Sequence, residues 1–210
     1  MPAISFDIGL RNLAVCKLDV NAETKIFDVS YWKVMSAVSE DLNVNKTSIE
    51  DLCPMFSSLI EEHLHEWTTD ISVAYIESQP MGRTRNLKTK VLSHILQVAL
   101  LRAKPDLRVQ FIHPTLKLKD MVGPRDYRKN KKHAILKTEE LLESEYCKNE
   151  SLKDIFVGTK RDDLADAFLQ GYHATWTQPP KTDKEPKKSK KSTTNKKKNG
   201  RSVPVVEGSL

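Results

Sequence analysis

The order of the apolar segments limits the fold of this 210-residue chain more than any other feature of its sequence. Three apolar runs with strand character fill the first 34 residues, and helical and strand-like patterns alternate after them. Consecutive strands favour an antiparallel meander, whereas strands separated by helices favour parallel pairing. The sequence therefore predicts an α/β fold in which helices flank both faces of a mixed five-stranded sheet. Strands are expected at 3–8, 13–20, 25–34, 72–77 and 108–112, and helices at 49–67, 86–103, 130–146 and 161–176.

Two of the expected helices carry further information. Thr47 and Glu50 have the spacing of a capping box, which predicts that the first helix begins there. The helix at 86–103 is apolar in nearly every direction in its second half. One apolar stripe is needed to cover the sheet, so the surplus indicates either a second buried face, such as a dimer interface, or a single deep core.

Charge divides the chain into two parts. The net charge is +6, but residues 179–210 hold ten Lys or Arg and three Asp or Glu, whereas residues 1–178 hold 24 and 25. Lys, Ser, Thr and Pro bury too little apolar surface to offset the entropy of ordering. We therefore predict a folded domain at 1–177 and a disordered Lys-rich tail at 178–210. The tail suits nucleic-acid attraction, nuclear targeting or simply solubility.

Several classes of protein are disfavoured by composition. No apolar run reaches the length of a membrane span, and the first residues lack the basic and apolar segments of a signal peptide. Cys16, Cys53 and Cys147 are few, odd in number and far apart, so neither a disulfide framework nor a zinc knuckle is indicated. We expect an intracellular protein without a membrane segment.

Four carboxylates occur in apolar settings. Asp7 interrupts the first strand and Glu77 ends the fourth, while Asp163 and Asp166 share one face of the last helix. An ionised carboxylate in apolar surroundings is costly unless it is paired or binds a metal. Taken singly, each has a simpler interpretation, such as a turn residue or a helix cap. Taken together, they indicate a Mg²⁺ site of the kind that hydrolyses phosphodiesters with two ions.

Basic residues are concentrated in two stretches, one after Glu77 and one beginning at Lys117. Such stretches can neutralise the phosphates of a nucleic acid, although a solvated surface is the simpler interpretation for any single residue. The candidate DNA-binding residues are Arg83, Arg85, Lys88, Lys119, Arg125, Arg128, Lys131 and Lys132.

Three motifs follow one another along the chain: FDIGLRNLA at 6–14, YIESQ at 75–79 and KRDDLADA at 160–167. Together they resemble the motifs of RuvC-like Holliday junction resolvases, a family of the RNase H-like superfamily. They are most similar to its poxvirus and large-DNA-virus branch. The similarity covers about residues 3–176 and implies the RNase H-like fold.

By this resemblance, Asp7, Glu77, Asp163 and Asp166 would bind two Mg²⁺ ions, for which Mn²⁺ would substitute. Lys117 would lie near the cleaved phosphate, as would one of Lys131 and Lys132. The role of Asp162 stays open. The resemblance also implies a homodimer that cuts four-way DNA junctions symmetrically and leaves 5′-phosphate ends, without a small-molecule cofactor. It would act in a host nucleus or at a cytoplasmic viral replication site if the source is a virus.

Three alternatives remain open at this point. The same acidic residues would serve another nuclease on this scaffold, acting on RNA–DNA hybrids or on other branched DNA. An actin-like or sugar-kinase-like phosphotransfer domain also begins with Asp-x-Gly, but the chain has only seven glycines and no second glycine-rich phosphate loop. A catalytically silent DNA-binding protein would not need all four carboxylates.

Overall fold

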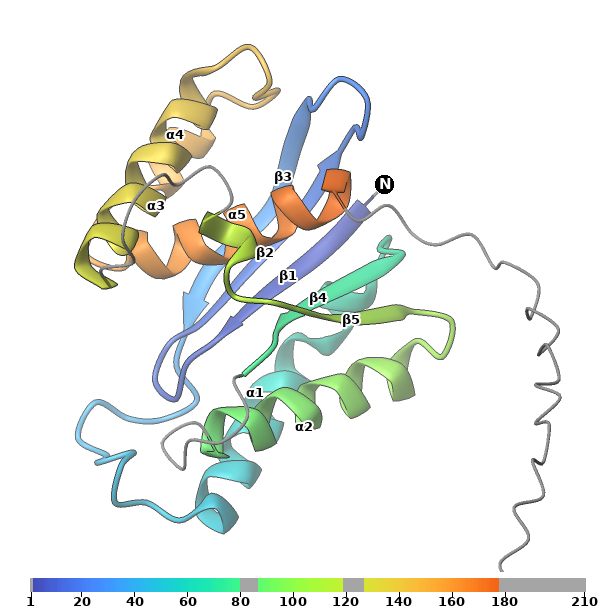
Figure 1. Ribbon diagram of the computed structural model, residues 1–210. Helices are drawn as coiled ribbons and strands as arrows, with labels where there is room; N and C mark the ends of the chain where they lie inside the picture. The colour runs from blue at the N-terminus through green and yellow to red at the C-terminus, as the bar shows by residue number, and fades with distance from the viewer. Residues whose placement is uncertain (1, 80–86, 119–126, 178–210) are drawn as a thin grey trace, which may run out of the picture. The chain divides into compact units, whose positions relative to one another are not determined.

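The computed structural model describes residues 2–79, 87–118 and 127–177, so the predicted tail at 178–210 lies outside the described part. Five strands form one mixed sheet in the order β3-β2-β1-β4-β5 (Figure 1). β1, β2 and β3 pair antiparallel, whereas β4 pairs parallel with both β1 and β5. The predicted mixed five-stranded sheet is confirmed. The strands are β1 (Pro2–Ile8), β2 (Leu13–Val20), β3 (Phe27–Met35), β4 (Val73–Glu77) and β5 (Arg108–Ile112).

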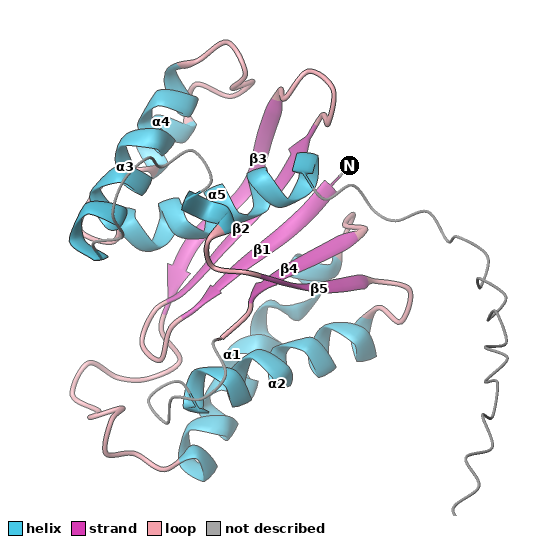
Figure 2. Cartoon of the chain, in the orientation of Figure 1, coloured by secondary structure: helices cyan, strands magenta, loops and turns pink. Residues whose placement is uncertain are grey.

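Helices cover both faces of the sheet (Figure 2). α1 (Ile49–Thr68) and α2 (Leu87–Ala103) lie on one face, and α5 (Arg161–Thr177) crosses the other with α3 (Tyr127–Glu143) packed outside it. Two short elements were not expected from the sequence, the 3₁₀ turn η2 (Leu116–Leu118) and α4 (Leu152–Ile155). None of the described helices has the length and apolarity needed to cross a membrane.

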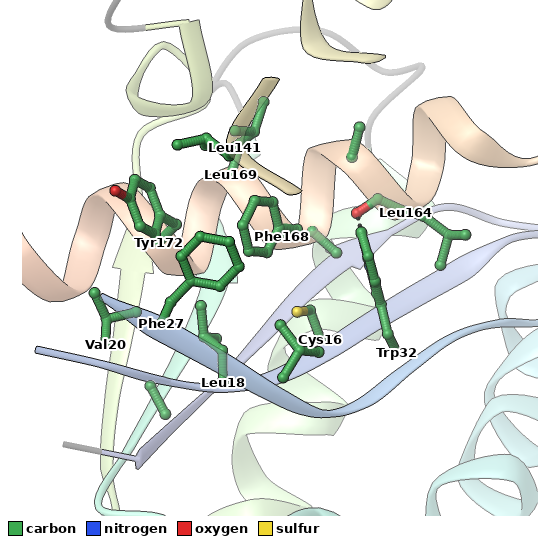
Figure 3. Packing of buried hydrophobic residues seen from close by; sticks show 14 of the residues in the cluster. Cys16, Leu18, Val20, Phe27, Trp32, Leu141, Leu164, Phe168, Leu169 and Tyr172 are labelled. Carbon is green, nitrogen blue, oxygen red and sulfur yellow. Dashed lines mark hydrogen bonds between the residues drawn. The ribbon is translucent and has the colours of Figure 1, made fainter. Parts of the chain in front are cut away.

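The core has two layers because side chains of a strand alternate between the faces of a sheet. In β1, Ile4 and Phe6 pack towards α1 and α2, while Ala3 packs towards α5. The α5 layer is aromatic: Phe168 and Tyr172 of α5 lie against Phe27 of β3 (Figure 3). Burial on both faces explains why the sequence of the first strands is so continuously apolar.

The start of α1 differs from the prediction by one residue. The N-cap is Ser48, whose extended backbone precedes the first turn and whose Oγ accepts a hydrogen bond from the Asp51 N–H at 3.0 Å. Thr47 donates its hydroxyl backwards to the carbonyl of Asn43 at 2.9 Å. The predicted capping box at Thr47 was therefore wrong, because the Thr47 hydroxyl bonds a carbonyl of the preceding turn and does not cap α1.

The connection between β3 and α1, residues 36–48, is irregular but tightly anchored. Arg11 donates to two of its backbone carbonyls, at 2.6 and 2.7 Å, and Lys88 donates to three, at 2.6, 2.7 and 3.0 Å. The accepting carbonyls belong to Glu40, Leu42, Val44, Asn45 and Thr47. These bonds satisfy carbonyls that no regular secondary structure would satisfy.

Candidate functional site

Parallel pairing of β1 with β4 brings two of the predicted carboxylates together. The register pairs Phe6 with Ile76, so Asp7 and Glu77 follow at the same end of neighbouring strands. Both side chains are mostly buried, with 19% and 13% of their surface exposed. Two acidic groups are therefore desolvated side by side where the strands end, which is unfavourable without a nearby cation.

Helix α5 brings the other two carboxylates to the same end of the sheet. The buried Gln170 donates from Nε2 to Ser5 Oγ and to the Phe6 carbonyl, both at 3.2 Å, which fixes the register of α5 on β1. The next residue, Gly171, permits this close approach, because a Cβ there would lie 2.9 Å from Ser5 Cβ. Asp166 lies one helical turn before Gln170, and so points towards the end of β1.

Lys117 of η2 joins three of the four carboxylates. Its Nζ lies 2.8 Å from Glu77 Oε2, 2.8 Å from Asp166 Oδ2 and 3.7 Å from Asp7 Oδ1. Because the lysine side chain is only 13% exposed, the ammonium is largely removed from water. Strands β1 and β4, helix α5 and the turn after β5 thus meet around one positive charge.

The fourth carboxylate lies in an adjoining cluster. Asp163 Oδ1 is 3.8 Å from Nζ of Lys131 on α3, and Lys131 also pairs closely with Asp162. Asp163 Oδ2 accepts a hydrogen bond from Asn12 Nδ2 at 2.8 Å. Asp162, whose role the sequence left open, is therefore placed beside the site, and of the two candidate lysines it is Lys131 that contacts the carboxylates.

The pKa values of these groups reflect crowding of negative charge in a desolvated place. Burial raises the pKa of Asp7 to about 7 and that of Asp166 to about 6, although Lys117 opposes both shifts. Burial and the neighbouring Asp162 raise the pKa of Asp163. Burial alone would lower the pKa of Lys117, but the surrounding carboxylates raise it above its usual value, so its ammonium stays charged. One lysine does not neutralise the group fully.

A cavity of about 240 Å³ opens onto this group. Its lining includes a residue that the sequence did not indicate, Asn130 of α3, whose side-chain oxygen is buried and has no hydrogen-bond partner among the described residues. No spacing or composition signal pointed to this residue. The residues that line the cavity are Glu77, Pro114, Thr115, Lys117, Asn130, Lys131 and Asp166.

The candidate DNA-binding residues are not all placed at this cavity. Lys131 lines it, Lys132 is exposed on α3, and the ammonium of Lys88 is occupied by carbonyls of residues 36–48. A contact of these residues with DNA stays a prediction. Five others cannot be placed in this way. Arg83, Arg85, Lys119 and Arg125 lie outside the described residues, and Arg128 lies in α3 with its side chain outside the description.

Within residues 2–79, 87–118 and 127–177, no three His, Cys, Asp or Glu side chains are already arranged as a metal-binding group. The carboxylates of Glu77 and Asp166 instead converge on the ammonium of Lys117. Metal binding at this site stays a prediction.

Comparison of the chain with protein-family models and with curated protein sequences finds no match. Solved structures do match. The yeast mitochondrial Holliday junction resolvase has a TM-score of 0.55 and 16% identity over 83% of this chain and 76% of its own. Fowlpox virus resolvase with its Holliday junction substrate has a TM-score of 0.55 and 16% identity over 83% and 98%.

RuvC of Thermus thermophilus in complex with a Holliday junction substrate is similar to the same degree. Its TM-score is 0.57, with 16% identity over 84% of this chain and 94% of its own. At such low identity, these likenesses establish the fold. The chain has the RNase H-like fold that the sequence motifs implied.

Proposed function

We propose that this protein is a metal-dependent endonuclease that resolves four-way DNA junctions. The observation that carries the proposal is the convergence of Asp7, Glu77 and Asp166, from three separate elements, on one buried cation position. The fold supports it, because two of the similar structures contain Holliday junction DNA. Activity on branched DNA implies an intracellular site of action, which would be a host nucleus or a cytoplasmic viral replication site if the source is a virus.

The residues at the site fit divalent metal ions. The Lys117 ammonium occupies a position that a divalent metal ion could take, since two carboxylate oxygens lie 2.8 Å from it. An all-oxygen set of carboxylates suits Mg²⁺ or Mn²⁺ rather than zinc. Asp7, Glu77, Asp163 and Asp166 would hold two such ions. When bound, the ions would supply an activated water and neutralise charge on the scissile phosphate.

The lysines of the cavity would assist the same reaction. Lys117 and Lys131 both line the cavity with Glu77 and Asp166, so a phosphate entering it would be within reach of two ammonium groups. Lys117, when its carboxylate partners hold metal, would stabilise negative charge that develops on the phosphate. The buried oxygen of Asn130 would accept a hydrogen bond from a water in the cavity. The products would carry 5′-phosphate and 3′-hydroxyl ends.

A homodimer would present two such sites to one junction. The surface between α1 and α2 holds an apolar groove of about 480 Å³, lined in part by Ile95, Val98 and Ala99. Val98 is 57% exposed, which is unfavourable for a large apolar side chain in water. A second copy related by two-fold symmetry would cover this groove and would place two active sites for paired, symmetric nicks.

The test is cleavage of three labelled substrates, a four-way junction, a matched linear duplex and an RNA–DNA hybrid, with and without Mg²⁺. We expect symmetric nicks in the junction only, absent without Mg²⁺ and absent with Asp7→Asn or Glu77→Gln, while junction binding persists. Asp106→Asn, an exposed carboxylate between α2 and β5, is the matched control and should cut normally.

The other outcomes assign other functions. Cleavage of the hybrid alone would make the protein a ribonuclease on the same fold. Tight junction binding without any cleavage would make it a DNA-binding protein. Normal cleavage by both Asp7→Asn and Glu77→Gln would show that the site is assigned wrongly.

A further inference from the structure

The turn between β1 and β2 places the side chain of Asn12 beside the start of α5. The turn is closed by a backbone hydrogen bond from Gly9 N to the Asn12 carbonyl at 2.9 Å. A Cβ at position 9 would lie 2.5 Å from that carbonyl oxygen, so glycine is required there. The hydrogen bond that closes the turn uses only the backbone of Asn12. The turn therefore does not explain why the side chain is that of asparagine.

Both polar atoms of the Asn12 side chain are engaged by residues distant in the sequence. Its Nδ2 donates to Asp163 Oδ2 at 2.8 Å, and its Oδ1 accepts from Lys160 Nζ at 2.7 Å. A carboxylate oxygen only accepts and an ammonium only donates, so the two partners fix the orientation of the amide. The amide thus connects the charge of Lys160 to one oxygen of Asp163.

This contact decides which way Asp163 presents its second oxygen. Asn12 holds Oδ2 of Asp163. The other oxygen, Oδ1, therefore faces the ammonium of Lys131, which lies 3.8 Å from it. A carboxylate held at one oxygen loses less rotational freedom when the other oxygen binds a cation.

We infer that Asn12, backed by Lys160, is a positioning residue that orients Asp163 for binding a divalent metal ion. The inference rests on the proposed function, because it presumes that the four carboxylates bind metal. Groups that hydrogen-bond a metal ligand typically change metal affinity by about 10–100-fold when they are removed.

A purely structural role for this side chain has less support. Among the hydrogen bonds of the described residues, the Asn12 side chain bonds neither the backbone of its own turn nor that of α5. The first turn of α5 is closed instead by the bond from Leu164 N to the Lys160 carbonyl at 3.1 Å. Loss of the amide should therefore leave the helix start and the turn intact.

The test is calorimetric titration of the full-length protein with Mn²⁺ in the absence of DNA. Asn12→Leu, which is nearly isosteric and forms no hydrogen bond, should weaken Mn²⁺ binding about 10-fold. Asp163→Asn should weaken it as well, and the double variant should be no weaker than Asp163→Asn alone, because Asn12 acts only through that carboxylate. Asn45→Leu, on the exposed part of residues 36–48, is the matched control and should bind as the wild type does.

Each result has one meaning. Wild-type affinity of Asn12→Leu, or losses that add in the double variant, would overturn the inference while leaving the proposed function in place. Absence of Mn²⁺ binding by the wild type would overturn the proposed function itself. If Asn12→Leu does not fold, Lys160→Met provides the same cycle with Asp163→Asn, with a smaller expected loss that must again vanish in the double variant.

Discussion

At the scale of single residues, the notable feature is a lysine that pairs with acidic groups at the proposed metal site. Lys117 forms close ion pairs with Glu77 and Asp166, and its ammonium lies 3.7 Å from Asp7. Burial raises the pKa of Asp7 to about 7, and the neighbouring Glu77 adds to this shift while Lys117 opposes it. The chain thus supplies its own counter-ion for these carboxylates.

Removal of that counter-ion should have opposite effects with and without metal. Lys117→Met leaves the carboxylates unpaired, so the metal-free protein should lose about 3 kcal/mol of stability, or roughly 10 °C in Tm. Mn²⁺ should then raise the Tm of the variant more than that of the wild type, because no ammonium has to be displaced. Thermal denaturation with and without Mn²⁺ measures both effects, with Lys132→Met on the exposed side of α3 as control. Equal Mn²⁺-induced shifts would contradict this exchange.

Protons compete with metal for the same carboxylates. Burial raises the pKa of Asp7 to about 7 and that of Asp166 to about 6, against the effect of Lys117. Both groups gain protons as the pH falls through these values, so apparent Mn²⁺ affinity should fall steadily from about pH 8 to about pH 5. Calorimetric titrations across this range measure it, and a constant affinity would contradict the assignment of these ligands.

The same shifts act in the opposite direction on the metal-free protein. A carboxyl whose pKa is raised by folding binds its proton more tightly in the folded state than in the unfolded one. These two groups therefore contribute stability that is present at low pH and is lost as the pH rises through their folded pKa values. Denaturation of the metal-free protein over the same pH range is the internal control for the titrations.

At the scale of elements, α5 both packs in the core and carries two of the candidate carboxylates. Its middle packs the aromatic layer of the core through Phe168 and Tyr172, while its first turns carry Asp163 and Asp166. The buried Gln170 and the close approach at Gly171 fix its register on β1. Core packing thus determines the separation between the carboxylates of the helix and Asp7 of the strand.

The backbone of the connection at residues 36–48 is held in place by basic side chains. Lys88→Met should release three carbonyls and so speed hydrogen exchange in residues 36–48, because their backbone loses its anchor. Exchange measured by mass spectrometry tests this, with Lys46→Met on the same connection as control for charge. In parallel, junction affinity should change little. A loss of affinity without faster exchange would assign Lys88 to DNA contact instead.

At the scale of the whole molecule, both helical layers of the folded part keep exposed apolar side chains. The surface of α1 and α2 keeps exposed apolar side chains, including Val98 and Leu101, beside the groove of about 480 Å³. Asp163 and Asp166 are held on the other layer by α5. A partner bound at α1 and α2 would therefore leave the α5 layer uncovered.

The proposed dimer interface on α1 and α2 can be tested by a single substitution. Val98→Glu places a charge in the apolar groove, so it should convert a dimer to a monomer and should reduce paired nicking to single nicks. Light scattering coupled to size-exclusion chromatography measures the mass. Leu136→Glu, which changes an equally exposed apolar residue on α3, is the matched control and should leave the dimer unchanged. A wild-type monomer, or a Val98→Glu dimer, would exclude this interface.

Most of the fold could be predicted from the sequence, because periodicity records which side of each element is buried. The strands at 13–20 and 108–112 have the expected bounds, and the mixed sheet follows from the order of the elements. The four carboxylates could be singled out as candidates for a similar reason, since a charge inside an apolar run is visible without a structure. The short elements η2 and α4 carry too few residues for any period to show.

The partners of individual side chains were decided only by the tertiary structure. Lys117 was expected near a phosphate, and the fold places its ammonium among carboxylates 40 and 49 positions away. Asn12 meets Asp163 across 151 positions, and Lys88 anchors a connection more than 40 positions before it. A sequence pattern specifies the face on which a side chain lies. The atom that it contacts there depends on how elements distant in the sequence pack together, and this packing is determined by the whole core.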